Sequence, residues 1–212
     1  DMTVRGRKAS VDDNFFDLLD KSDFLFGAFV HLEARQGVWG GYLEGNFSYI
    51  EAEESGRRGR EAQVETRLIF GEAAMFHQLA GGFVADPADG RRWAIDGVAG
   101  ARITHFEAEL GIGPLQRSRS TTWVDPIIGL RGQIDLDERW SLAAHADIGG
   151  FGVGSEFAAN LYAVARVKFD LFGVPAIGSF GYRGLYFDYE GSGSDGAKLW
   201  LHGPVIGLTF RL

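Results

Sequence analysis

The sequence predicts an all-β chain whose strands form one antiparallel up-and-down barrel over residues 1–212. Three observations predict this fold class. Apolar and polar residues alternate with period two along most of the chain, as they do where the side chains of a strand point to two different faces. Glycine and aromatic residues are abundant, with 31 glycines and 13% aromatic residues against only five prolines. The connections between the alternating segments alternate between short and long.

The alternation is clearest in the second half of the chain. In residues 160–169, Asn160, Arg166 and Lys168 share one face, while Leu161 and Val167 share the other. The same pattern predicts strands at residues 125–136 and 140–148. Weaker alternation predicts strands at residues 24–35, 39–52, 61–70 with an irregularity near Gly71, 93–109, 176–189 and 198–212.

Residues 2–11 are predicted as a tenth strand, because nine strands would leave the two ends of the barrel on opposite rims. Eight strands are the alternative count. Before the next strand, the segment "DNFFDLLDKSD", residues 13–23, predicts a short helix in the first long loop, with Asp13 or Asn14 as its N-cap.

The predicted connections differ in length between the two rims. Short turns at residues 36–38, 137–139 and 172–174, and a connection of intermediate length at 84–91, fall on one rim. Longer loops at 53–60, 110–122, 150–156 and 190–197 fall on the other rim. This asymmetry is typical of outer-membrane barrels. The stretch "GGFGVGS", residues 149–155, lacks the lysine and the helix of a phosphate-binding loop, so we interpret it as a tight exit from a strand.

The composition narrows the function. A net charge of −8 and an isoelectric point near 5.1 argue against a nucleic-acid partner. The absence of cysteine excludes disulfides and thiolate catalysis. The longest apolar run, "FLFGAFV" at residues 24–30, is far shorter than a membrane-spanning helix. The chain starts with polar residues, so we expect that a signal peptide has been removed.

Three features favour a barrel with a polar lumen and an apolar outside over a soluble barrel. In each predicted strand, one set of alternate positions, the polar parity, is polar. It carries charges of both signs that can pair across a narrow lumen: His31, Glu33, Arg35, Glu44, Arg67, Asp96, Arg102, Asp125, Arg131, His145, Asp147, Arg166 and Arg183. Tryptophans fall near strand ends, where interface aromatics of membrane barrels lie: Trp39, Trp93, Trp123, Trp140 and Trp200. In the last strand, Gly207 is followed by Phe210 and Leu212.

This ending resembles the C-terminal signal that the barrel-assembly machinery reads in outer-membrane barrels. The segments "WVDPIIGLRGQI", "WSLAAHADIGGFGVGSEF", "GYRGLYFDYEG" and "HGPVIGLTFRL" resemble the C-terminal half of an uncharacterised, alphaproteobacterial-type family of bacterial outer-membrane β-barrel proteins. "HLEARQGVWGGYLEGNFSYI" resembles the N-terminal hairpin of that family. The resemblance implies the barrel fold, the bacterial outer membrane as location and the barrel-assembly machinery as a partner during biogenesis. It implies no reaction.

The lumen charges allow two interpretations. They either form a paired network in a plugged or very narrow lumen, or line a selectivity constriction or proton path. We favour the network, because an inward charge without a partner is costly. No cofactor and no metal site are predicted, since His31 and His145 each lack a convergent third ligand.

Candidates for catalysis are His105 and Glu107, on the lipid-facing parity near the long-loop rim, with Ser118 and Ser120 in the adjacent loop. We expect these residues to lie in a solvated strand extension rather than in an enzyme. Arginines in two long loops suit the phosphates of lipopolysaccharide: Arg57, Arg58, Arg60, Arg117 and Arg119.

We therefore expect an integral outer-membrane protein with a structural or interaction role, in contact with the lipid bilayer and lipopolysaccharide and with outer loops able to bind a protein. The alternatives are a small-solute pore, then a lipid-modifying enzyme, then a soluble lipocalin-like carrier.

Overall fold

The computed structural model of the chain describes residues 2–4, 7–9, 24–55, 61–84, 90–112, 115–190 and 196–210. It is all-β, as predicted, with nine long strands and two short ones. The segment predicted as a short helix, residues 13–23, lies outside the described residues. In the part of the chain that is described, no helix is long and apolar enough to cross a membrane.

The long strands form one antiparallel up-and-down sheet. They are β3 (Phe24–Gln36), β4 (Trp39–Ser55), β5 (Glu61–Phe83), β6 (Arg92–Ile112), β7 (Leu115–Asp135), β8 (Trp140–Gly150), β9 (Phe157–Leu171), β10 (Val174–Glu190) and β11 (Gly196–Phe210). Each of them pairs with its neighbours in sequence, from β3 at one edge to β11 at the other. The short strands β1 (Met2–Val4) and β2 (Arg7–Ala9) follow β11 in the sheet.

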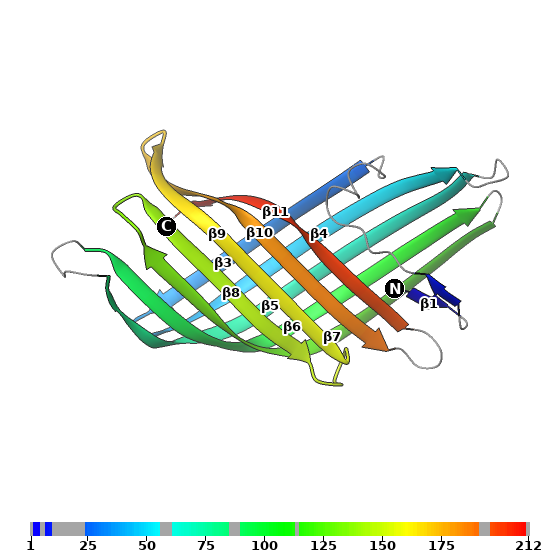
Figure 1. Cartoon of the computed structure of the whole chain (residues 1–212), viewed down its shortest axis with the longest axis horizontal. Helices are drawn as coiled ribbons and strands as arrows, with labels where there is room; N and C mark the ends of the chain where they lie inside the picture. Colours follow the sequence, from blue (N-terminus) through cyan, green and yellow to red (C-terminus); the bar gives the residue numbers. More distant parts are fainter. Residues whose placement is uncertain are drawn as a thin grey trace.

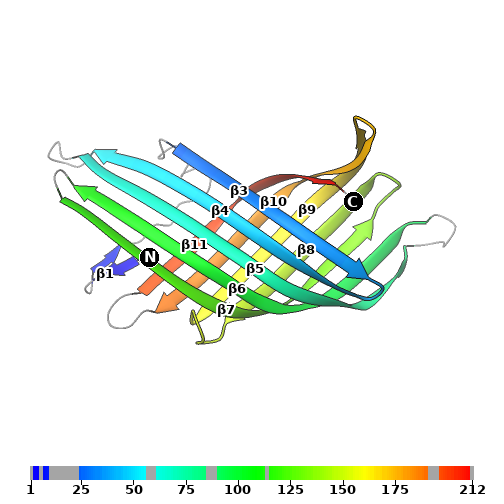
Figure 2. The ribbon, with the colours of Figure 1, turned by 180° about the vertical axis from the view of Figure 1, so that it is seen from behind.

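The sheet is strongly curled. In Figure 1 the strands β9, β10 and β11 cross in front of β3, β4 and β5 at a steep angle, and Figure 2 shows the same crossing from behind. Steep tilt and curl are what closing a sheet into a barrel requires. No ladder between β3 and β11 occurs among the described residues, so the sheet is a curled half-barrel.

The predicted tenth strand at residues 2–11 is wrong. Met2 pairs with Ala197 at the start of β11, but the registers Val4↔Arg7 and Met2↔Ala9 make β1 and β2 the two arms of a small hairpin. The period-two pattern of this segment does not distinguish one strand from two short ones that fold back on each other. The described sheet thus has nine long strands rather than ten or eight, and β3 and β11 run in the same direction.

Other features also differ from the prediction: β5 runs to Phe83 rather than ending at residue 70. β6 and β7 pair out to Ile112↔Leu115, through most of the stretch predicted as the loop 110–122. "LQRSRSTT" carries polar residues at both parities, so it gives no alternating signal although it forms a strand. The expected irregularity at Gly71 is absent, because Gly71 pairs in register with Gly45 and Ile103; the bulge lies between Gln78 and Ala80.

The short turns lie at one end of the sheet, at the left of Figure 1. Asp137 stabilises the turn between β7 and β8, where its Oδ1 accepts hydrogen bonds from the backbone N–H groups of Trp140 and Arg139, both at 2.7 Å. These two donors hold the pKa of Asp137 below its usual value. Asp170 accepts the backbone N–H of Gly173 at 2.7 Å in the turn between β9 and β10.

The two faces of the sheet differ in chemistry. On β5, Leu68, Phe70 and Phe76 are buried on the concave face, while Ile69 and Met75 are 43% and 63% exposed on the convex face. The convex face is apolar and exposed over many strands, with large side chains at Val30, Leu32, Leu43, Ile95, Ile103, Val124, Ile128, Leu130, Ile134, Leu142, Ile148, Leu161, Phe180, Ile206, Leu208 and Phe210.

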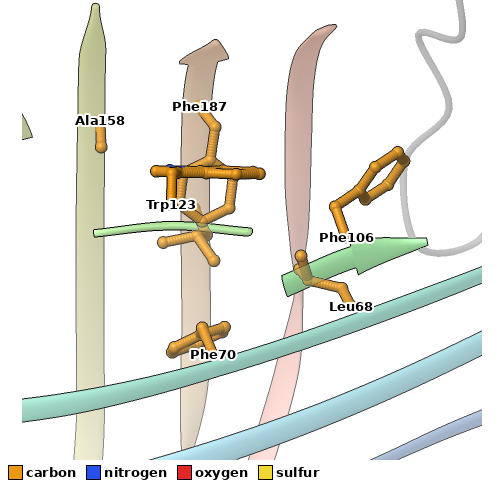
Figure 3. Packing of buried hydrophobic residues seen from close by; sticks show 7 residues of the cluster. Leu68, Phe70, Phe106, Trp123, Ala158 and Phe187 are labelled. Atoms are coloured by element: carbon orange, nitrogen blue, oxygen red, sulfur yellow. The ribbon is translucent and has the colours of Figure 1, made fainter. Parts of the chain in front are cut away.

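Apolar clusters fill part of the concave side. One cluster gathers side chains from β5, β6, β7, β9 and β10, as Figure 3 shows: Leu68, Phe70, Phe106, Trp123, Ala158, Leu185 and Phe187. A second contains Tyr42, Ala74, Phe76, Val98 and Ile127. Side chains from strands far apart in sequence thus occupy the interior of the curl.

Candidate functional site

The candidate site is a network of charged and polar side chains on the concave face. Its most buried member is Arg102 on β6, whose side chain is fully buried. Arg102 Nε donates to Glu72 Oε1 and its Nη2 donates to Asp147 Oδ1, both at 2.7 Å. The Tyr42 hydroxyl donates to the other oxygen of Glu72 at 3.3 Å. Two buried carboxylates therefore share one guanidinium.

From Asp147 the network continues across β9 and β10. Asn160 Nδ2 donates to Asp147 Oδ2 at 2.7 Å, and His145 Nε2 lies 2.9 Å from the same oxygen. Arg183 Nε donates to the amide oxygen of Asn160 at 3.0 Å, and Arg183 Nη1 donates to Glu44 Oε1 at 2.5 Å. The last bond links β10 to β4 across the interior of the curl.

A second branch reaches β3. His31 places Nδ1 3.2 Å from Glu44 Oε2 and Nε2 3.4 Å from Glu33 Oε2. Arg131 Nη1 and Nη2 donate to the two oxygens of Glu33 at 2.7 and 3.0 Å. Asp96 then accepts from Arg131 Nε at 2.9 Å and from Arg35 Nη2 at 2.5 Å.

The network is continuous and close to neutral. Every strand from β3 to β10 contributes to it, and its four arginines face five carboxylates: Arg35, Arg102, Arg131 and Arg183 with Glu33, Glu44, Glu72, Asp96 and Asp147. Buried charges that are paired and multiply hydrogen-bonded are the arrangement that offsets desolvation. This arrangement supports a structural role, in which paired side chains fill the interior of the sheet and hold its strands together.

An aromatic ring completes this part of the interior. The guanidinium of Arg131 lies 3.5 Å from the centre of the Phe76 ring, and that of Arg35 lies 4.9 Å from it. A Cβ on Gly40 would lie 2.1 Å from Phe76 Cζ, so only glycine leaves room for the ring at that position. Such stacking of guanidinium on an aromatic face is favourable where both are desolvated.

The structure brings together most of the side chains predicted to line the lumen: His31, Glu33, Arg35, Glu44, Asp96, Arg102, Arg131, His145, Asp147 and Arg183. Sequence reasoning missed Glu72, because the strand predicted at 61–70 stopped before it; extending the parity of Leu68 and Phe70 through Gly71 would have found it. It also left Tyr42 and Asn160 out of the network.

Three residues predicted to line the lumen lie outside the charged network. Arg67 is on the convex face, where it lies 3.5 Å from Glu107, so its placement in the lumen is wrong. The parity error follows from the weak alternation of "EAQVETRLIF". Arg166 is on the concave face but forms no ion pair with the described residues. Asp125 is buried on the concave face, outside the charged network.

Asp125 instead holds the glycine-rich loop after β8. Its Oδ1 accepts the backbone N–H of Ser155 at 2.7 Å, and its Oδ2 accepts Trp123 Nε1–H at 2.9 Å. Ser155 is only 1% exposed, so the loop folds against the sheet. Gly150 has a φ of 90°, and a Cβ on Gly154 would lie 2.3 Å from Val124 O. The glycines permit this close approach.

The tryptophans divide between the faces. Trp39, Trp140 and Trp200 are exposed on the convex parity, and Trp93 shares that parity. Trp123 is buried in the first apolar cluster and stacks on Tyr189 with ring centres 4.7 Å apart, so its predicted interface position is wrong. Gly207 and Phe210 lie on β11, and Leu212 falls outside the described residues.

The two residues considered for catalysis, His105 and Glu107, each interact with a different partner and not with each other. Both lie on the convex parity of β6, as predicted. His105 Nδ1 lies 2.7 Å from the Thr122 hydroxyl, and the Glu107 carboxylate is paired with Arg67. Ser118 and Ser120 belong to β7 rather than to a loop.

Within the described residues, no group of three or more His, Cys, Asp or Glu side chains could hold a metal ion. The side chains of the arginines predicted to bind lipopolysaccharide, Arg57, Arg58, Arg60, Arg117 and Arg119, fall outside the description. No protein-family profile, curated protein or solved structure matches the chain.

Proposed function

We propose that this protein is an integral β-barrel of the bacterial outer membrane with a structural or interaction role. The observation that carries the proposal is the distribution of polarity across the sheet. Charged residues are buried on the concave side and large aliphatic residues are exposed on the convex side, which is the reverse of a soluble barrel. An exposed apolar face of this extent needs an apolar surrounding.

The state of the lumen supports a structural role over a conducting one. Apolar clusters and the charged network occupy the concave side, and the network bonds cross it from β10 to β4 and from β7 to β3. A barrel of this size has an interior that side chains can fill. The function would then lie in the loops at the long-loop rim, as a contact for lipopolysaccharide or for a partner protein.

The membrane assignment is tested by one substitution on the convex face. Leu130 is 54% exposed there, so Leu130→Arg would be nearly neutral in a soluble protein. At the midplane of a bilayer an arginine costs about 2–4 kcal/mol. We expect the variant to refold into lipid vesicles with a correspondingly lower stability, measured by urea titration and by the heat-modifiable migration of the folded band.

Gln133→Arg is the matched control, because Gln133 lies on the concave parity of the same strand and should tolerate the charge. A wild-type protein that stays monodisperse without detergent, with Leu130→Arg as stable as wild type, would contradict the proposal and favour a soluble carrier. Steady unitary currents in a planar bilayer would replace the structural role by that of a pore.

A further inference from the structure

Arg166 lies on the concave face but outside the charged network. Arg35, Arg102, Arg131 and Arg183 each bind at least one carboxylate. Arg166 lies half-buried on the same face of β9 and has no ion pair or side-chain hydrogen bond with the described residues. A half-buried cation without a carboxylate partner has positive potential available for a ligand.

The neighbours of Arg166 are hydroxyl donors. The register places Ser141 of β8 directly opposite Arg166 on one side and Ser179 of β10 directly opposite on the other. Directly opposed residues have Cβ atoms about 5 Å apart, so both hydroxyls lie beside the arginine stem. Lys168 follows two residues later on the same face and adds a second cation.

The same row continues to β11. Its next member is Gly207, which lies opposite Ser179 and has no side chain. Phe29 of β3 lies over this position, with Cζ 3.3 Å from where a Cβ on Gly207 would be. The ring lies at the β11 end of the row, where Ser179 Cβ is 3.9 Å from the same position.

The nearest carboxylates of the concave face are already engaged. Asp135, opposite Ser141 on β7, accepts the backbone N–H of Arg92 at 3.1 Å. Asp170, beyond Lys168, accepts the backbone N–H of Gly173. Neither makes a hydrogen bond or ion pair with Arg166 or Lys168.

We propose that Arg166, Lys168, Ser141 and Ser179 form an anion-binding site at the short-turn mouth of the barrel, and that it takes a phosphate group. A guanidinium offers parallel N–H donors to phosphate oxygens, and serine hydroxyls can donate to the remaining oxygens. The site depends only on the register of β8 to β11, so it goes beyond the proposed membrane role and stands independently of it. In an outer-membrane barrel this mouth faces the periplasm.

The test is a titration of the folded, isotope-labelled protein in a zwitterionic detergent with inorganic phosphate, at constant ionic strength set with sodium chloride. We expect saturable shifts of the amide signals of Ser141 and Ser179. Arg166→Gln should weaken binding by roughly tenfold or more, since it removes a charge-assisted contact. Arg67→Gln, on the convex face, is the matched control and should bind as wild type.

Lys168 is exposed, so Lys168→Gln provides a second variant that should fold even if Arg166→Gln does not, and it should weaken binding in the same direction. The absence of a saturable shift in the wild type would overturn the proposal. So would equal affinities of wild type, Arg166→Gln and Lys168→Gln. Because the titration is read on folded protein, its failure would leave the test at Leu130 untouched.

Discussion

Removal of the Arg102 guanidinium tests whether the charged network stabilises the interior of the sheet. Arg102 is fully buried and binds Glu72 and Asp147 at 2.7 Å each. Arg102→Met keeps much of the side-chain volume but leaves two carboxylates, both nearly inaccessible to solvent, without their shared cation. Breaking a buried ion pair from one side typically costs about 3–5 kcal/mol. Glu72 retains the Tyr42 hydroxyl and Asp147 retains Asn160, so we expect a loss within that range rather than above it.

The assay is equilibrium urea unfolding of the vesicle-embedded protein, followed by tryptophan fluorescence. With a slope of about 2–3 kcal/mol per molar urea, the expected loss lowers the midpoint by roughly 1–2.5 M. Arg67→Met is the control, because the Arg67 side chain is 47% exposed and its pair with Glu107 is worth about 0–1 kcal/mol.

A double variant separates charge from shape. Glu72→Gln in the Arg102→Met background removes one of the two carboxylate charges that have lost Arg102, so it should recover part of the lost stability. A loss below about 1 kcal/mol for Arg102→Met, or a loss equal to that of Arg67→Met, would refute the view that the network braces the interior.

Three further predictions concern the strands, the loop and a turn. Gly181→Ala should lower stability by about 1–3 kcal/mol, because its Cβ would lie 2.0 Å from a backbone oxygen of β9, whereas Gly45→Ala, with no atom within 4 Å, should be neutral in the same urea titration. Asp125→Ala removes the acceptor that holds the glycine-rich loop, so limited proteolysis within residues 150–156 should become roughly tenfold faster or more; unchanged cleavage would show that the loop is held otherwise. The lowered pKa of Asp137 means that its turn is stabilised at neutral pH and loses this stabilisation as the pH falls through the lowered pKa. The amide shifts of that turn should therefore titrate below the reference value of 3.8, and Asp137→Asn should abolish the step.

The sequence predicts the strands well where one face is apolar and the other polar. Residues 160–169 alternate cleanly, and β9 covers them with two or three more residues at each end. The pattern fails where polar residues stand at both alternating positions of a strand, as in the stretch of β7 through Ser118 and Ser120, because period-two alternation records a difference between two faces.

The alternation of residues along the strands also predicts most of the side chains of the network, but not which of them pair with one another. Which carboxylate meets Arg102 depends on the curl of the whole sheet, since Asp147 lies 45 residues away along the chain. Glu72 and Arg67 show the sensitivity of such predictions to a strand boundary: one was missed and the other was placed on the wrong face of the same strand, β5. The predicted interface position of Trp123 is wrong for a related reason. A large aromatic residue near a strand end fits an interface girdle and an interior cluster equally well.

The nearest-neighbour order of the sheet has a consequence for how the chain assembles. Each long strand pairs with the strand just before or after it, so every ladder can form as soon as two consecutive segments exist, at low cost in loop-closure entropy. The bonds Arg131–Glu33 and Arg183–Glu44 instead join residues 98 and 139 positions apart. They can form only after the intervening hairpins have been laid down and the sheet has curled. The arginine contacts of Glu33 and Glu44 therefore form late, whereas their contacts with His31 lie within the first long hairpin. A chain interrupted before β10 would keep its early hairpins while Glu44 still lacked its arginine.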